Sequence, residues 1–282
     1  MNYLVLEKGL IGNTIYQYPV GLTVFSTVNE LEFNGGDLKP ASEKPTREEL
    51  LSYYTRFVLK NDLNVQWEEE VVRVEKIGEN HFKITSSKGI YEAKNVLFAF
   101  GAMRNLRRLG AKGEDLPKVH HLFRETYPYV KKNAMVIGGG NSACDVVSEA
   151  ARVGREAHLS LRRGYWFLPK TLFGQPSAES AAVHFPVFLQ RFLVKLLLKI
   201  VVGKYEDYGL PHPDHKLFEH HPTVSSEIMH YLKHGRIKAH KDVKNLEGKT
   251  VEFVDGERIE VDTIVCATGD FVSFPFLPEN LV

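Results

Sequence analysis

The feature that most constrains this chain is a glycine-rich turn in the middle of the sequence. The stretch MVIGGGNSACDVVSEAARVGREAHLSLRR, residues 135–163, reads as an apolar strand, a turn, a helix and a second strand. Gly138, Gly140 and Ala143 occupy the GxGxxG/A positions of the turn. Glycine permits the tight turn and the close approach of a pyrophosphate, which the free N–H groups at the helix start stabilise. The pattern predicts a dinucleotide-binding unit, and a purely structural turn is the alternative.

The end of the second strand indicates which dinucleotide is bound. NAD sites usually carry an acidic residue about 20 residues after the turn, whereas an arginine there accommodates the 2′-phosphate of NADP. Arg162 and Arg163 stand at this position, and a guanidinium suits a phosphate better than an ammonium does. We therefore predict NADPH as the cofactor, with a solvated basic turn as the alternative. The residues expected to hold it are Gly138, Gly140, Asn141, Ser142, Arg162 and Arg163.

Composition excludes several other classes of protein. The 282 residues are 43% hydrophobic and 25% charged, which suits a globular protein of two modest domains. A net charge of +1 provides no basic field for nucleic acid. Cys144 and Cys266 form neither a CxxC pair nor a disulfide framework, and no secretory signal is visible, so a cytoplasmic location is expected. No apolar run is long enough to predict a spanning helix.

Apolar periodicity and helix-capping residues predict helices and strands on both sides of the central unit. We predict a strand at residues 3–7, a helix capped by Thr46 with Glu49, and a β-meander between residues 65 and 89. A further strand, NVLFAFG, is expected to end at Gly101, and GAKGEDLPKVHH to form a linker. The tail predicts a helix at SSEIMHYLKHG, strands at RIKAH and KTVEFV, a DG turn at Asp255 and a further strand segment at IEVDTIVCATGD.

Several of these segments resemble flavoproteins that bind two dinucleotides. LVLEKG, with Glu7 at its end, is similar to the second strand of an FAD-binding half, whose acid would hold the ribose. Ala99, Phe100 and Gly101 resemble one linking strand of such proteins, and Ala267, Thr268 and Gly269 resemble the other. Through this resemblance Glu7, Thr268 and Gly269 become candidate FAD contacts.

The resemblance implies an α/β fold of Rossmann-like, three-layer type, with an NADP-binding domain inserted into an incomplete FAD-binding domain. The expected parts are residues 1–115 for FAD, residues 116–257 for NADP with a helical insert at about 164–222, and residues 258–282 as the return strand for FAD. A second GxGxxG turn should stand about 20 residues before Glu7. The sequence contains no such turn before Glu7, so we expect this chain to retain FAD weakly.

Two subfamilies compete within this resemblance. RRGYWFLPKTLFGQP and GLPHPDHKLFEHHPTVSSEIMHYLKHGRI resemble flavin-containing monooxygenases. NTIYQYPVGLTVFSTVNELE and LPKVHHLFRETYPYV are more similar to bacillithiol-disulfide-reductase-like flavoproteins. The monooxygenase fingerprint FxGxxxHxxx is not intact around His120 and His121, and Asp270 replaces the tyrosine of ATGY.

The resemblance implies an NADPH-dependent FAD oxidoreductase acting on a small molecule. We expect monooxygenase-like oxygenation of a soft nucleophile or a ketone. The alternatives are a disulfide or quinone-type reductase without oxygen insertion, and a truncated domain that binds NADPH without activity. The sequence identifies neither the catalytic residues nor the substrate.

Two further features invite other interpretations. Seven of the 12 histidines lie between His212 and His240, but their spacing matches no metal site, and we predict none. The apolar segment at residues 187–202 carries Arg191, Lys195 and Lys199 at intervals of four. We expect a packed helix or a homodimer contact; a membrane-surface helix or a lid over an apolar substrate is the alternative.

Overall fold

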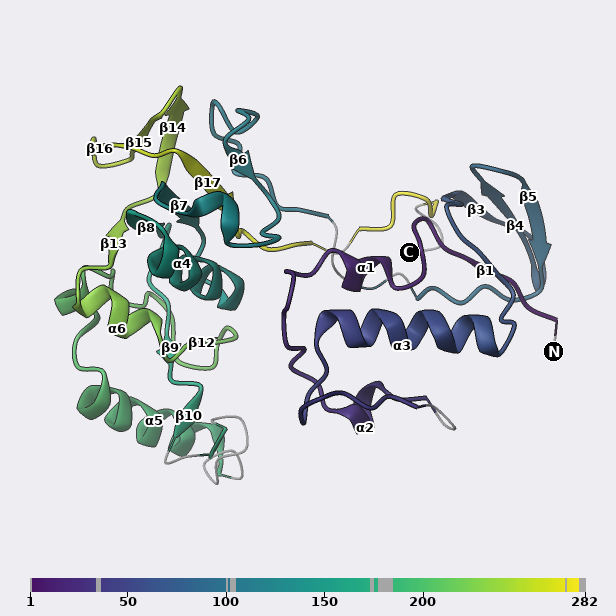
Figure 1. Ribbon diagram of the computed structural model, residues 1–282, viewed down its shortest axis with the longest axis horizontal. Coiled ribbons are helices and arrows are strands. Elements are labelled where there is room, and N and C mark those ends of the chain that lie inside the picture. The colour runs from purple at the N-terminus through teal and green to yellow at the C-terminus, as the bar shows by residue number, and fades with distance from the viewer. Residues whose placement is uncertain are drawn as a thin grey trace. The chain divides into compact units, whose positions relative to one another are not determined.

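A computed structural model describes residues 2–33, 37–99, 101, 105–172, 175–176, 185–271 and 273–278. The chain divides into two compact units, and Figure 1 labels most of their elements. Unit 1 comprises Met1–Asn105 and Asp270–Val282, and unit 2 comprises Leu106–Gly269. Unit 2 thus interrupts unit 1 in the sequence. The strand that precedes Gly269 pairs within the sheet of unit 2 and therefore belongs to that unit.

Unit 2 is built on a five-stranded parallel sheet of order β13-β8-β7-β17-β6 (Figure 1). The residues of β7, β8 and β17 are almost all buried, as expected for strands covered on both faces. The strands are β6 (Val119–His120), β7 (Asn133–Ile137), β8 (Glu156–Ser160), β13 (Ile237–His240) and β17 (Thr263–Cys266). The segment expected to be a linker therefore contributes a strand, β6, to the sheet.

Successive side chains along each strand point to opposite faces of the sheet, so they belong to two separate cores. Ala134 and Val136 of β7 pack with helices α4 and α6, whereas Met135 and Ile137 pack with the antiparallel sheet β14-β15-β16. Unit 2 therefore has three layers: helices, parallel sheet and antiparallel sheet. The elements are α4 (Asn141–Val153), α6 (Ile228–Lys233), β14 (Val243–Glu247), β15 (Thr250–Phe253), β16 (Arg258–Glu260) and the short 3₁₀ turn η1 (Tyr127–Tyr129).

Unit 1 combines one long helix with two small sheets. Helix α3 (Arg47–Lys60) begins at the predicted capping box: the Glu49 N–H donates to Thr46 Oγ1 at 3.3 Å, and the Thr46 N–H donates to Glu49 Oε2 at 2.8 Å. The predicted meander is present as an antiparallel sheet of three strands. The remaining elements are α1 (Asn13–Tyr16), α2 (Val28–Leu31), the parallel pair β1 (Val5–Leu6) and β2 (Val65–Gln66), and the meander strands β3 (Val71–Gly78), β4 (His81–Ser86) and β5 (Ile90–Ala93).

The strand expected at NVLFAFG does not form in residues 95–99. Leu97 is 92% exposed there, so this apolar run lacks the buried setting that a central strand needs. Phe100, one of the residues likened to a linking strand, lies outside the described residues. Apolar composition alone was therefore a poor guide to this segment.

The described part of the insert after β8 combines one helix with short strands and a 3₁₀ turn. Its described elements are the strands β9 (Phe167–Leu168), β10 (Thr171–Leu172), β11 (Gln175–Pro176) and β12 (Thr223–Val224), helix α5 (Val187–Val201) and the 3₁₀ turn η4 (Tyr205–Tyr208). Strand β12, at the end of the insert, pairs in parallel with β9, near the start of the insert.

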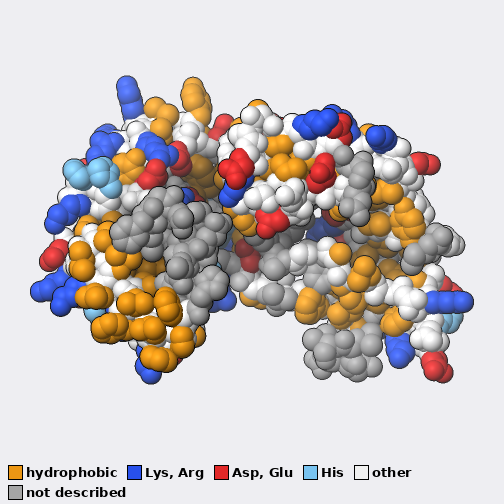
Figure 2. All heavy atoms as spheres, turned by 90° about the horizontal axis from the view of Figure 1, so that it is seen from below, with side chains coloured by type: hydrophobic (Ala, Val, Ile, Leu, Met, Phe, Trp, Pro, Cys, Tyr) orange, Lys and Arg blue, Asp and Glu red, His pale blue; other side chains and the backbone are white. Residues whose placement is uncertain are grey.

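Within this chain helix α5 leaves most of its apolar surface exposed, so packing against the insert covers little of it, and the homodimer contact stays a prediction. Of its residues only Leu198 is buried. Four large side chains at intervals of four lie on its open side: Phe188, Phe192, Leu196 and Ile200, exposed by 74%, 64%, 48% and 75%. Figure 2 shows hydrophobic side chains gathered at the place of this helix, at the lower left. Among the described residues, no helix is both long and apolar enough to cross a membrane.

Candidate functional site

The glycine turn lies at the carboxyl edge of the parallel sheet, where β7 ends and α4 begins. Gly138 adopts a φ of 137°, which side-chain-bearing residues rarely adopt. A Cβ at this position would lie 2.3 Å from the Ala267 carbonyl oxygen, just past the end of β17. The turn therefore needs glycine here for two reasons, its backbone conformation and the close approach of the neighbouring strand.

Gly140 has the opposite environment. It is exposed, and a Cβ built on it would meet no atom within 4 Å. It forms the N-cap of α4, and Asn141 and Ser142, both exposed, begin the helix. The first N–H groups of a helix lie outside its own hydrogen-bond ladder and carry its positive dipole end. Open space beside such a helix start fits the pyrophosphate of a dinucleotide.

Ala143 fills the third position of the motif and is fully buried. Its Cβ lies 3.4 Å from the place that a Cβ of Gly138 would occupy. A small residue is required because helix and strand meet closely at this point. The first and third motif positions are thus closely packed, whereas the second, Gly140, is open.

The two arginines after β8 differ in their surroundings. Arg162 is exposed, and the described residues form no hydrogen bond or ion pair with its guanidinium. Arg163 is half-buried, and its Cζ lies 5.4 Å from the centroid of the Tyr165 ring. Within the described part of the chain its Nε is buried without a hydrogen-bond partner. Arg162 is thus exposed to solvent, whereas Arg163 lies against Tyr165.

Thr268 and Gly269 also lie in unit 2, directly after β17. The Thr268 hydroxyl donates to the Arg107 carbonyl oxygen, and the Arg107 N–H donates to the Gly269 carbonyl oxygen at 2.9 Å. Glu7 lies in unit 1, where its Oε1 accepts a hydrogen bond of 2.8 Å from the Gly9 N–H. The structure thus gathers the candidate residues at one sheet edge except Glu7, which belongs to the other unit.

A polar cluster follows β6 in the same unit. His121 Nε2 lies 2.9 Å from Arg108 Nη1 and 3.6 Å from Glu114 Oε1. Glu114 also accepts the N–H groups of Leu109 and Gly110, each at 3.0 Å. The carboxylate therefore organises the loop before β6 and holds His121 beside it.

No sequence pattern pointed to two residues that contact the turn from the insert. The ring of Tyr165 lies against Gly139, and the Thr223 hydroxyl donates to the Gly139 carbonyl oxygen at 2.6 Å. Thr223 is 84 residues away in the sequence, so no local pattern could relate it to the turn.

Neither cysteine is available for thiol chemistry. Cys144 and Cys266 are both buried and unpaired. Burial raises the pKa of the Cys144 thiol to about 12, and it raises the pKa of Cys266 to about 12 as well. Both thiols therefore stay protonated at neutral pH and act as small apolar residues.

Two histidines of the histidine-rich stretch lie beside separate carboxylates. His212 lies beside Glu206, with Nδ1 and Oε1 3.1 Å apart, and His215 beside Asp214, with Nδ1 and Oδ1 2.9 Å apart. No group of three or more His, Cys, Asp or Glu side chains suited to a metal ion occurs among the described residues.

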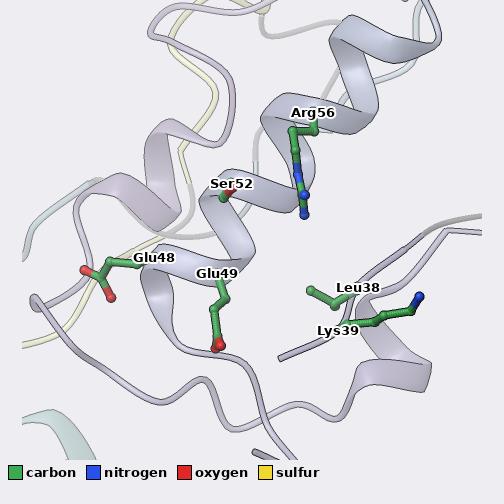
Figure 3. A pocket seen from close by; sticks show the side chains of 6 residues that line it. All are labelled: Leu38, Lys39, Glu48, Glu49, Ser52 and Arg56. Carbon is green, nitrogen blue, oxygen red and sulfur yellow. The ribbon is translucent and has the colours of Figure 1, made fainter. Parts of the chain in front are cut away.

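A surface pocket of about 290 Å³ lies in unit 1 beside α3 (Figure 3). It is lined by Leu38, Lys39, Glu48, Glu49, Ser52 and Arg56. Glu49 accepts hydrogen bonds from the N–H groups of Thr46 and Ala41, both at 2.8 Å, and Glu48 pairs with Arg47. These carboxylates hold the start of the helix, so the pocket carries less evidence for a ligand than the glycine turn does.

Comparisons with known proteins divide the chain into two overlapping parts. Residues 1–172 match the family described as pyridine nucleotide-disulphide oxidoreductase. Residues 118–282 match the family described as flavin-binding monooxygenase-like. Each match covers more than half of the chain, and the overlap contains the glycine turn.

Individual relatives show the same division. Bacilliredoxin reductase Bdr of Bacillus subtilis (strain 168) is 38% identical over 166 residues, which cover 59% of this chain and 51% of that protein. Dimethylaniline monooxygenase (N-oxide-forming) 2 of Oryctolagus cuniculus is 26% identical over 260 residues, which cover 83% of this chain and 48% of that protein. The chain thus spans about half the length of these two curated relatives.

Solved structures agree on the fold. The bacillithiol disulfide reductase Bdr of Staphylococcus aureus has a TM-score of 0.68 at 26% identity, covering 97% of this chain and 70% of that one. A cyclohexanone monooxygenase from Rhodococcus sp. Phi1, bound to NADP+, has a TM-score of 0.72 at 17% identity, covering 95% of this chain and 65% of that one. The second likeness concerns the fold alone. The chain therefore belongs to the pyridine nucleotide-disulphide oxidoreductase family through residues 1–172 and to the flavin-binding monooxygenase-like family through residues 118–282.

Proposed function

We propose that this chain is the NADPH-binding part of a flavoprotein oxidoreductase with monooxygenase-like activity. The observation that carries the proposal is the carboxyl edge of the parallel sheet in unit 2. There an open glycine N-cap at Gly140 begins α4, and an exposed guanidinium at Arg162 follows the adjacent strand β8. The helix start would bind the pyrophosphate, and Arg162 would bind the 2′-phosphate.

Each residue has a distinct task in this proposal. Gly138 lets the turn pass close to β17, and Gly140 leaves room for the phosphates. The N–H groups at Asn141 and Ser142 would donate to phosphate oxygens, because they begin the helix. Arg163 would support the site through its contact with Tyr165 and not through the phosphate.

FAD is proposed as the second cofactor through the family. When bound, a flavin supplies redox chemistry between the nicotinamide and a second substrate. Glu7, Thr268 and Gly269 remain the candidate contacts for it. In the described residues of unit 1, no helix of eight or more residues begins at a glycine turn, since α3 begins at Thr46. The described part of unit 1 therefore lacks the kind of phosphate site that α4 provides in unit 2.

Oxygenation is favoured over disulfide reduction by the state of the two cysteines. A reductase that relays electrons through its own thiols needs an accessible pair, and Cys144 and Cys266 are buried and separate. The match over residues 1–172 supports the reductase alternative. Such a reductase would pass electrons to a disulfide or quinone without using these cysteines. For the monooxygenase we propose a soft nucleophile, such as an amine or sulfide, or a ketone as substrate, and a cytoplasmic location.

Stoichiometry separates these functions. With excess FAD, a monooxygenase consumes one NADPH and one O₂ for each oxygenated product, and the second oxygen atom leaves as water. A reductase oxidises NADPH without O₂ when a disulfide or quinone is added under argon. Calorimetric titration of the purified chain with NADPH tests the nucleotide site itself, and absence of binding would contradict the proposal.

A further inference from the structure

The glycine turn is held from outside by the insert between β8 and α6. A Cβ at Gly139 would lie 2.2 Å from the ring of Tyr165, so the ring occupies the space that a side chain would need. Gly139 is buried, whereas Gly140 beside it is exposed. One side of the turn therefore packs against the insert and the other side is open.

Strand β12 joins the insert to the turn. The N–H of Thr223 donates to the Trp166 carbonyl oxygen at 2.9 Å, next to β9, and the Ser225 N–H donates to the Leu168 carbonyl oxygen at 2.8 Å. The N–H of Val224, between them, donates to Asn141 Oδ1 at 2.8 Å. Because N–H groups alternate in direction along a strand, β12 binds β9 on one side and the start of α4 on the other.

Thr223 forms the direct bond to the turn. Its hydroxyl donates to the Gly139 carbonyl oxygen at 2.6 Å, and the threonine is only 3% exposed. The bond is shielded from water, so removing the hydroxyl would leave a buried carbonyl without this partner. The bond also fixes a peptide in the middle of three consecutive glycines, which have more conformational freedom than other residues.

We propose that Thr223 is a positioning residue for dinucleotide binding, holding the Gly139 peptide so that the open side of the turn is preformed. The inference rests on the proposed nucleotide site. A flexible GGG turn would lose conformational entropy when it binds a pyrophosphate, and a turn held by Thr223 has already lost it. The insert is therefore part of the binding site, although it supplies no phosphate contact in this proposal.

The effect should be the same for both nicotinamide dinucleotides. NADPH and NADH share the pyrophosphate and differ at the 2′-phosphate, which Thr223 does not address. Thr223→Val, which removes the hydroxyl at nearly constant shape, should weaken the binding of both by about fivefold to tenfold. The NADPH-to-NADH affinity ratio should not change, and Thr223→Ser, which keeps a hydroxyl, should restore most of the affinity.

The experiment measures both affinities by calorimetry, together with amide hydrogen exchange of the unliganded chain and its thermal midpoint. Thr263→Val is the matched control, because Thr263 is also buried and begins β17 in the same sheet. We expect Thr223→Val to accelerate exchange at residues 138–142 while exchange in β7 and β8 stays unchanged. If Thr223→Val does not fold, Asn141→Ala removes the other bond between β12 and the turn and should also accelerate exchange there.

The outcomes separate this inference from the proposed function. Failure of the unaltered chain to bind either nucleotide overturns the proposed function, while hydrogen exchange still tests whether Thr223 orders the turn. Nucleotide binding with equal affinity in Thr223→Val, or unchanged exchange at residues 138–142, overturns the positioning role and leaves the proposed function in place. A loss specific to NADPH also overturns it, because it would place Thr223 at the 2′-phosphate.

Discussion

Gly138 and Ala267 approach so closely that a β-carbon on Gly138 would lie 2.3 Å from the Ala267 carbonyl oxygen. The contact joins the end of β7 to the end of β17, two neighbouring parallel strands. It explains why the first motif position needs glycine, whereas the second glycine, Gly140, faces open space. The two glycines should therefore respond differently to the same substitution.

Gly138→Ala should destabilise unit 2 by about 2 kcal/mol or more, since the new methyl group meets backbone at an unfavourable φ. Gly140→Ala should leave stability nearly unchanged and lower nucleotide affinity, because its methyl group would project into the space proposed for the phosphates. Urea unfolding and NADPH titration of both variants check this. Equal stability losses would show that the two positions are not distinct.

NADPH should bind at least about tenfold tighter than NADH, because a charge-assisted arginine contact contributes roughly 1.5 to 3 kcal/mol. Arg162→Ala should remove the difference, and Arg162→Ala combined with Arg163→Ala should remove it equally. Arg163→Ala alone should retain discrimination, since Arg163 contacts Tyr165. Competition between the two nucleotides in calorimetry measures the ratio. Equal affinities in the unaltered chain would refute the assignment.

Stability should fall as the pH is lowered from about 6.5 toward 4, because of His158. This side chain is buried, and burial, with a smaller contribution from His240, lowers the pKa of His158 to about 4. Glu156 and Lys238 also face it, with opposite effects. The unfolded chain binds this proton near the ordinary pKa of about 6.5, whereas the folded chain binds it only near pH 4. Stability is therefore lost as the pH falls between these two values, and His158 adds no further loss at lower pH.

The check is the urea midpoint at pH 7.5 and pH 5. We expect His158→Gln to flatten the pH dependence by on the order of 2 kcal/mol. His234→Gln, at an exposed histidine of the same unit, is the control and should leave the dependence intact. An unchanged slope in His158→Gln would show that another group controls acid stability.

The 282 residues expressed alone should retain FAD weakly. Among their described residues one helix of eight or more residues starts at a glycine turn after a strand, namely α4, and we assign it to NADPH. The absorption spectrum of the purified chain and a titration with added FAD measure the affinity. A yellow protein with nearly stoichiometric FAD would mean that another segment or a partner supplies the flavin phosphate site.

The exposed apolar side of α5 should make the isolated chain self-associate, because contiguous apolar surface of this kind usually marks an interface. Phe192→Glu with Ile200→Glu should shift the sedimentation coefficient toward the monomer. Glu156→Gln, away from the helix, should not. A chain that stays monomeric but sediments with anionic liposomes in a salt-sensitive way would instead support a membrane contact.

The sequence by itself determined the central unit well. The strand, the turn and the helix of residues 133–153 appear as predicted, because glycine spacing, apolar periodicity and caps act over a few residues. The same holds for the cap of α3 at Thr46 and for the meander β3-β4-β5. The roles of the candidate cofactor residues remain predictions.

Only the tertiary structure decided which apolar segments are buried and which distant residues meet. NVLFA and α5 are as apolar as core elements, yet Leu97 and Phe188 are exposed, since burial depends on what the rest of the chain provides as a partner. Thr223 reaches Gly139 across 84 residues because β12 pairs with β9. Local patterns specify backbone conformation, whereas long-range pairing is a property of the whole fold, and the site needs both.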